Sequence, residues 1–144
     1  MDIKQKALFL IRKYGTNDPF DLALALGIKI LYEELGSING YYNMQLRMKQ
    51  IHINHNLSLD QQYVTCAHEL GHAVLHPKAN TPFLRANTFF SIDKMEIEAN
   101  TFAAELLIPD SLILENPEFT RQQIARLAGY NERIMEFKKY VNRG

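Results

Sequence analysis

The stretch CAHELGHAVLH, residues 66–76, holds three of the five histidines of the chain. His68 and His72 are four residues apart, so on a helix of about 3.6 residues per turn they project from the same face, one turn from each other. Two imidazoles in this arrangement can bind one Zn²⁺ at about 2.0–2.1 Å each. Glu69 lies about 100° further around the helix axis, where it can accept a proton from water beside the metal without being a ligand. The pattern predicts a hydrolytic metal centre with His68 and His72 as ligands and Glu69 as the catalytic carboxylate.

The residues around this motif support a helix and assign other roles to its remaining metal-binding side chains. Ser58 followed by Gln61 is a capping-box pattern, and Pro77 must end the helix. His76 lies another turn along, but three ligands in a line on one helix do not surround a metal. We interpret it as a helix-end histidine, which the helix dipole favours. Cys66 lies on nearly the opposite face from the paired histidines and is interpreted as a small buried hydrophobic residue.

A catalytic zinc commonly takes three protein ligands, so a third must come from elsewhere. The extended motif H-E-x-x-H-x-x-G-x-x-H is excluded, because its glycine and last histidine would be Leu75 and Lys78. The segment KMEIEANTF offers Glu96 and Glu98 instead. We favour Glu96, because Asn100 shares its helix face and can hydrogen-bond the free nitrogen of a ligand histidine. Glu98 remains the alternative ligand, and a solvated acidic helix face is the alternative for the whole segment.

Composition restricts the class of protein. The 144 residues are enough for one compact domain, residues 1–144, and a hydrophobic content of 47% argues against disorder along the whole chain. Basic and acidic residues balance at 16 each, which argues against a strongly basic nucleic-acid binder and a polybasic membrane anchor. The single cysteine excludes an intramolecular disulfide and a four-cysteine zinc site. The apolar run Ala7–Ile11 is too short for a signal-peptide core or a membrane span, so we expect a soluble cytoplasmic protein.

Hydrophobic periodicity predicts an α+β fold of helices packed with a small, mostly antiparallel sheet. Beyond the central helix, spacing and capping residues predict helices over residues 3–14, 18–27 and 94–108, and one or two over 120–140 with a break around Gly129. Residues rich in β-branched and aromatic side chains predict three short strands, which we expect to form an antiparallel meander: 28–34, 40–46 and 49–55. Residues 77–92 are expected to form a loop.

Two motifs together resemble the ImmA/IrrE family of zinc metallopeptidases. The first is AHELGHAVLH, and the second, EIEANTFAAELLIP, matches the family pattern E-x-x-A-N-x-F-A-A-x-L-L-x-P from Glu96 to Pro109. The segments GYY and IHIN resemble the strand region of the family, and KYGTNDPFDLALALGIKI resembles its opening helices. The resemblance extends from about the first helix to Pro109 and shows no departure at the metal or general-base positions. The C-terminal helical part, about residues 115–144, is less distinctive.

The resemblance implies a zincin-like fold, with a small sheet beside the active-site helix. It also implies that His68, His72 and Glu96 bind Zn²⁺, with Glu69 as the catalytic carboxylate. Members of the family typically act beside phages, mobile elements or stress regulons. Their usual substrate is a helix-turn-helix transcriptional repressor, which is cut to relieve repression, so the expected partner is a protein of this kind.

A zinc peptidase also needs a substrate-binding edge and a donor for the oxyanion that forms during peptide hydrolysis. We expect the extended substrate to pair with an exposed strand, and QIHIN, residues 50–54, is the candidate edge strand. Several tyrosines and histidines are candidate oxyanion donors, and the sequence does not choose among them: Tyr41, Tyr42, His52, His55 and Tyr63.

Two other functions compete with proteolysis. A zinc-dependent regulator could bind a repressor without cutting it, although such a protein would not need Glu69. A DNA-binding protein is the second alternative, because TRQQIARLAGYNERIMEFKK, residues 120–139, faintly resembles a helix-turn-helix. The neutral overall charge argues against direct nucleic-acid binding. The metal, too, stays open, since this motif also accepts Mn²⁺ and other divalent ions.

Overall fold

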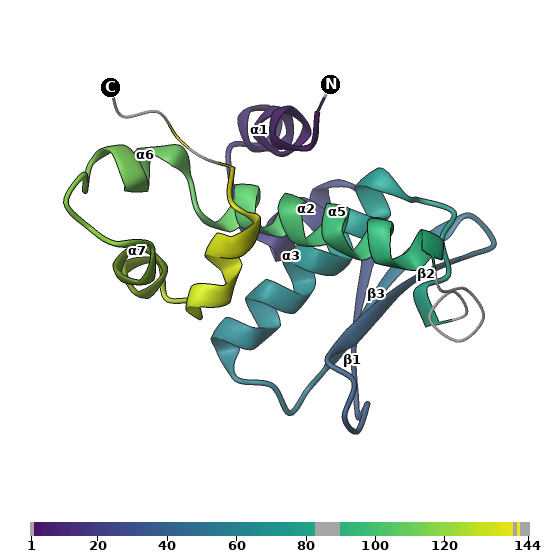
Figure 1. Ribbon diagram of the computed structural model, residues 1–144. Helices are drawn as coiled ribbons and strands as arrows, with labels where there is room; N and C mark the ends of the chain where they lie inside the picture. Colours follow the sequence, from purple (N-terminus) through teal and green to yellow (C-terminus); the bar gives the residue numbers. More distant parts are fainter. Residues whose placement is uncertain (1, 83–89, 140, 142–144) are drawn as a thin grey trace.

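The computed structural model describes residues 2–82, 90–139 and 141 (Figure 1). Two N-terminal helices precede a three-stranded sheet, and further helices follow it. In chain order the elements are α1 (Ile3–Tyr14), α2 (Pro19–Ala25), β1 (Lys29–Glu33), β2 (Gly40–Gln45), β3 (Met48–Asn54), α3 (Leu59–Leu75), α5 (Phe90–Leu107), α6 (Asp110–Leu114), α7 (Arg121–Ala128) and the 3₁₀ helix η1 (Glu132–Phe137). The expected α+β class is confirmed, and in Figure 1 the sheet and the C-terminal helices lie on opposite sides of α3.

The sheet has the strand order β1-β3-β2, with β1 parallel and β2 antiparallel to β3. The expected meander is therefore wrong in its order, because β3 lies between the other two strands. Burial explains the arrangement: β3 is buried without interruption from Ile51 to Asn54, whereas β1 and β2 carry partly exposed residues. A strand covered on both faces favours the centre of a sheet, where its backbone is also paired on both sides.

The helices α3 and α5 form the most extensive helix–helix contact of the fold. Gly71 makes this contact close, because a Cβ atom at this position would lie 3.1 Å from both the Cα and the carbonyl oxygen of Ala99 on α5. The completely buried Leu70 and Phe102 pack in the core around it. Gly71 thus lets the backbone of α5 approach the helix that carries the paired histidines.

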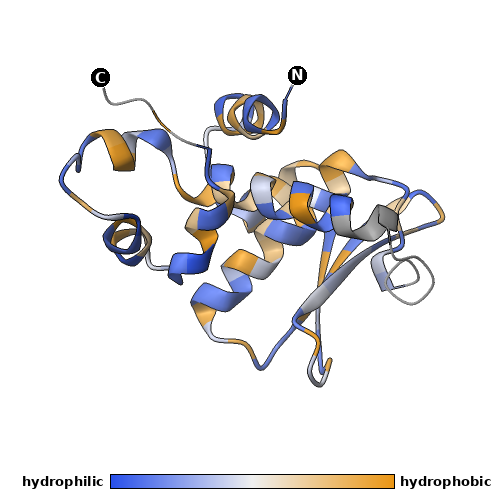
Figure 2. Cartoon of the chain, viewed as in Figure 1, coloured by the Kyte–Doolittle hydropathy of each residue, from blue (hydrophilic) through white to orange (hydrophobic). Residues whose placement is uncertain are grey.

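Hydrophobic and polar positions are interspersed along these helices (Figure 2), and the buried hydrophobic residues of both belong to one core cluster. A buried ion network adds to the packing at the C-terminal side. Lys138 Nζ lies 2.6 Å from both Glu105 Oε1 and Asp110 Oδ1, and Lys4 Nζ lies 2.9 Å from Asp110 Oδ2. This network connects α1, α5, α6 and the residues after η1. Within the described part of the chain, no helix is long and apolar enough to cross a bilayer.

Helix boundaries agree with the sequence in most places. Ser58 precedes α3 and donates its N–H to Gln61 Oε1 at 3.2 Å, as the capping-box pattern predicts. The break at Gly129 is confirmed, with φ of 93°, and the segment after it is the short 3₁₀ helix rather than a second α-helix. The helix α5 begins at Phe90, four residues before the expected start, and residues 81 and 82 are also helical. The expected loop over 77–92 is therefore wrong at these positions, and its residues 83–89 lie outside the described residues.

Candidate metal centre

One helical face of α3 presents the paired histidines of the motif. His68 and His72 lie one turn apart with their ring centroids separated by 4.9 Å and their planes nearly perpendicular. Together with Glu69 they offer nitrogen and carboxylate oxygen atoms that all lie within 4.8 Å of one another. His72 and Glu69 are buried, and His68 is partly buried. The three side chains of the H-E-x-x-H motif therefore converge on one small volume.

The carboxylate of Glu96, on α5, faces both imidazoles. Its Oε2 lies 2.7 Å from Nε2 of His68, and its Oε1 lies 3.2 Å from Nε2 of His72. Asn100, one turn along α5, lies with its Oδ1 2.7 Å from Nδ1 of His68, the nitrogen on the other side of that ring. Glu98 points elsewhere and contacts Nε2 of His76 at 3.1 Å. Of the two glutamates that the sequence left open, the structure thus brings Glu96 to the paired histidines.

Burial and charge act differently on the two imidazoles. Burial holds the pKa of His72 below its usual value, although the contact with Glu96 acts in the opposite direction. Burial also acts to lower the pKa of His68, but its hydrogen bond to Glu96 and the negative charge of Glu69 outweigh burial and raise that pKa above its usual value. The neutral imidazole is the form that binds metals, so the environment of His72 favours ligation directly.

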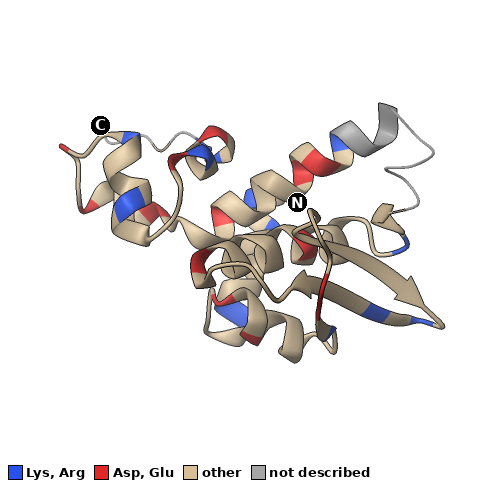
Figure 3. Cartoon of the chain, turned by 90° about the horizontal axis from the view of Figure 1, so that it is seen from below, with Lys and Arg blue, Asp and Glu red and all other residues tan. Residues whose placement is uncertain are grey.

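These donors fit a zinc ion. Two imidazole nitrogens and one carboxylate are a donor set of catalytic zinc sites, and ligands at about 2.0–2.1 Å in a tetrahedron lie about 3.3 Å apart. The separation of 3.2 Å between His72 and Glu96 meets this requirement, and that of 2.7 Å between His68 and Glu96 needs a small lengthening. Acidic residues on α5 add negative charge beside the site (Figure 3). His68, His72 and Glu96 are therefore the residues that would hold the ion.

An open cleft of about 430 Å³ lies beside His68 and Glu69. Its remaining wall comes from the start of β2 and the segment before it, from α3 and from α5: Ser37, Ile38, Asn39, Gly40, Val64, Thr65 and Asn100. A Cβ atom at Gly40 would lie 2.6 Å from Cγ2 of Thr65 and 2.5 Å from the backbone oxygen of His52. Only glycine allows β2 to pass so close to the helix, and this approach forms one side of the cleft.

Among the described residues that line this cleft, none is one of the five candidate oxyanion donors. The hydroxyl of Tyr42 donates to the carbonyl oxygen of Pro77, and burial raises the pKa of Tyr42 to about 12. Tyr41 stacks on His52, which contacts Glu33 through Nδ1 and Asn43 through Nε2.

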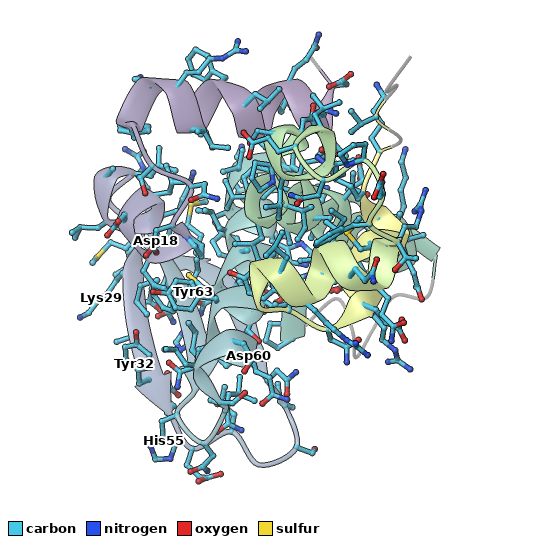
Figure 4. All side chains as sticks on the ribbon, turned by 90° about the vertical axis from the view of Figure 1, so that its left-hand side faces the viewer. Asp18, Lys29, Tyr32, His55, Asp60 and Tyr63 are labelled. Carbon is cyan, nitrogen blue, oxygen red and sulfur yellow. The ribbon has the colours of Figure 1, made fainter. Side chains whose placement is uncertain are left out.

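The last two candidates are also engaged elsewhere. His55 pairs with Glu34 at 3.2 Å, and Tyr63 donates to Asp18 at 3.3 Å. In Figure 4, Tyr63 lies beside Asp18, and His55 lies near one end of the sheet. None of the five predicted residues is therefore placed to donate to an oxyanion in this cleft.

The candidate edge strand is wrong, because β3 is hydrogen-bonded on both sides. The outer edge beside the cleft belongs to β2. At Tyr42 this edge is already used, since the backbone N–H donates to Oγ1 of Thr81 at 3.0 Å and the Thr81 hydroxyl donates back to the Tyr42 carbonyl at 3.0 Å. The part of this edge that borders the cleft is at Gly40. The backbone N–H and C=O groups of Gly40 point to the same side of the strand as those of Tyr42, because residues two apart in a strand share this direction.

The fold and the site define a class of protein, an α+β protein built around an H-E-x-x-H helix and a facing glutamate from a second helix. The family model Peptidase_M78, described as the IrrE N-terminal-like domain, matches residues 23–139. The chain belongs to this metallopeptidase family, which confirms the resemblance seen in the two motifs.

Two curated relatives align along almost the whole chain. A protein of Bacillus phage phi105 named "Uncharacterized immunity region protein 2" is 45% identical over 139 residues, which cover 94% of this chain and 88% of the relative. Metallopeptidase ImmA of Bacillus subtilis (strain 168) is 34% identical over 142 residues, covering 94% of this chain and 83% of the relative. A solved structure titled "Mycobacterium tuberculosis transcriptional regulator" shares the fold with a TM-score of 0.61 at 15% identity; the match covers 92% of this chain and 44% of that one.

Proposed function

We propose that this chain is a zinc-dependent endopeptidase that cleaves a helix-turn-helix transcriptional repressor of a phage, mobile element or stress regulon. The observation that carries the proposal is the carboxylate of Glu96 in contact with Nε2 of both His68 and His72, with Glu69 beside them. The names of the two relatives, an immunity-region protein and a metallopeptidase, support a peptidase linked to repressor control. Such a substrate would place the protein in the cytoplasm.

A bound zinc ion would supply Lewis acidity, which polarises the scissile carbonyl and acidifies water. Glu69 accepts the proton of the attacking water on its carboxylate and passes it to the leaving amine. Glu69 is almost completely buried in the wall of the cleft, beside the imidazoles of His68 and His72. Asn100 holds His68 through Nδ1 and directs Nε2 of that ring toward the ion.

The substrate would bind as an extended strand along the outer edge of β2 at Gly40, where β2 pairs with no other described strand. Gly40 lies beside the cleft, and its backbone can pair with a peptide that enters from the Ser37 side. Thr81 occupies the edge at Tyr42 and ends this pairing. A helix-turn-helix repressor would therefore have to present a loop or an unfolded segment, because an intact helix cannot pair with a strand edge.

The test is co-incubation of the purified, zinc-loaded chain with the repressor encoded beside its gene, followed by mass spectrometry of the products. We expect two fragments from one cleaved bond, and none with Glu69→Gln, which should keep its zinc and lose activity about 10²–10⁴-fold. A stoichiometric complex with no fragments would instead indicate a regulator that binds without cutting. Fragments produced at the same rate by Glu69→Gln would refute the role of Glu69.

A further inference from the structure

His76 and Glu98 form an ordered pair next to the candidate metal centre, although neither faces the volume where the donors converge. Nδ1 of His76 lies 3.4 Å from Nδ1 of His72, and Nε2 of His76 lies 3.1 Å from Oε1 of Glu98. The side chain of His72 is completely buried, that of His76 is 14% exposed and that of Glu98 33% exposed. The two contacts connect a carboxylate on α5 to the back of a ligand histidine on α3.

Proton positions along this chain of contacts follow from chemistry. A histidine that binds a metal through Nε2 is neutral and carries its proton on Nδ1, so Nδ1 of His72 must donate a hydrogen bond. Its neighbour is Nδ1 of His76, which can accept only if the proton of His76 is on Nε2. That N–H then donates to Glu98, a carboxylate that can only accept. Donors and acceptors alternate along the chain, and Glu98 sets its direction.

We propose that His76 and Glu98 are positioning residues that fix the tautomer and ring orientation of His72 for zinc binding. The inference rests on the proposed function, because it assigns His72 as a ligand. The two ligand histidines then have different supports. His68 is held directly by the amide oxygen of Asn100 at 2.7 Å, whereas His72 is held through a second imidazole. Without Glu98, His76 can place its proton on Nδ1, and two N–H groups would then face each other.

The helix geometry explains why Glu98 serves this role and not that of a ligand. Residues two apart on a helix point about 200° from each other, so Glu96 and Glu98 cannot reach the same atom. His76 lies one turn beyond His72 on α3, at the point where the helix ends. Glu96 therefore meets the histidines at the site, and Glu98 meets the histidine one turn further along.

The experiment measures the zinc dissociation constant of each variant by competition with a chromogenic chelator. We expect Glu98→Ala and His76→Phe each to weaken zinc binding about 10-fold, within the range of about 10–100-fold for residues that support a metal ligand. Thr101→Ala is the matched control, because Thr101 lies on the same helix near Glu98 and its hydroxyl donates to the carbonyl oxygen of Ile97 on that helix. Its zinc affinity should equal that of the wild type.

Three further measurements distinguish a positioning role of His76 and Glu98 from a merely structural one. His76→Asn should restore most of the affinity lost in His76→Phe, because its amide oxygen can accept from Nδ1 of His72. The double variant of His76→Phe with Glu98→Ala should lose no more than either single variant, since both break one chain of contacts. Long-range ¹H–¹⁵N spectra of the zinc-loaded protein should show His76 protonated on Nε2 in the wild type and a larger Nδ1-protonated population in Glu98→Ala.

The outcomes distinguish this inference from the proposed function. If Glu98→Ala and His76→Phe both bind zinc as tightly as the wild type, the positioning role is overturned and the site remains intact. A wild-type His76 that carries its proton on Nδ1 would overturn it as well. Failure of the wild-type chain itself to bind zinc, or no weakening in Glu96→Ala, would refute the metal centre. Circular dichroism of each variant verifies that a loss of affinity is not a loss of fold.

Discussion

Replacing Gly71 by alanine tests whether the close approach of α5 to α3 sets the geometry of the proposed metal centre. The new Cβ would lie 3.1 Å from Cα and from the carbonyl oxygen of Ala99, and 3.2 Å from Cβ of Phe102. Carbon atoms in comfortable contact lie about 3.5–4.0 Å apart, so the two helices must separate by about 0.4 Å. Two of the three nearest atoms belong to backbone, which cannot rotate away.

Two opposing effects decide the change in stability. Alanine favours a helix over glycine by about 1 kcal/mol, whereas overpacking of a core contact costs about 1–3 kcal/mol. We therefore expect Gly71→Ala to lower the free energy of unfolding by about 1 kcal/mol. Ala99 lies between Glu96 and Asn100, so the displacement moves both side chains away from the paired histidines. Because Glu96 is a proposed ligand and Asn100 supports His68, a displacement of a few tenths of an ångström should weaken zinc binding about 10-fold.

The assay combines urea unfolding with the chelator competition described above. Ala104→Gly is the matched control, because it removes one methyl group from a buried position on α5 and costs a similar free energy without pushing the helices apart. Its zinc affinity should stay at the wild-type value. If Gly71→Ala is more stable than the wild type and binds zinc equally well, the contact is not limiting and the reasoning is refuted.

Three further predictions concern the third ligand, the ion network and the cysteine. Glu96→Ala should weaken zinc binding by more than about 100-fold, beyond the effect of a supporting residue; a loss no larger than that of Glu98→Ala would contradict its role as a ligand. Burial acts to raise the pKa of Asp110, but the hydrogen bonds from Lys138 and Lys4 act in the opposite direction and outweigh burial. The pKa of Asp110 therefore lies below its usual value. The ionised carboxylate therefore stabilises the fold above about pH 4, and this contribution is lost as the pH falls. Asp110→Asn should lower the free energy of unfolding by about 1 kcal/mol at pH 7 and make the stability measured by urea unfolding fall less steeply between pH 7 and pH 3. An equally steep fall in the wild type and the variant would contradict this role of Asp110. Burial raises the pKa of the Cys66 thiol far above its usual value, and the charges of Asp18 and Glu69 add a smaller contribution. A maleimide should therefore label Cys66 only after denaturation. Rapid labelling of the folded protein would show that the core opens.

Local chemistry explains what could be predicted without a structure. The capping pattern at Ser58 and the proline at position 77 act within a few residues, so they locate α3 within one or two residues of its observed ends. The spacing of His68 and His72 is itself a distance on a helix, and it placed their rings together. Gly129 ends α7 because it adopts a left-handed conformation that most residues avoid.

The misjudged features depend on elements that meet only in three dimensions. The sequence order of the strands suggested a meander, yet the continuous burial of β3 places it in the centre, and this removes its edge from any substrate. The candidate oxyanion donors were chosen by residue type, but their neighbours, such as Glu33 for His52 and Asp18 for Tyr63, come from other elements. No spacing along the chain reports such contacts.

The sequence by itself determined the family, the α+β class and the pair of histidines, because these are recorded in motifs and in helical periodicity. The sequence also favoured Glu96 over Glu98 as the third ligand, but only the tertiary structure shows which glutamate faces that pair. Glu96 and Glu98 differ by two positions and by about 200° around α5, and the packing of that helix on α3, where Ala99 lies against Gly71, orients Glu96 and not Glu98 toward the histidines. The packing that brings Glu96 to His68 and His72 also places Glu98 against His76, because the same orientation of α5 positions both side chains.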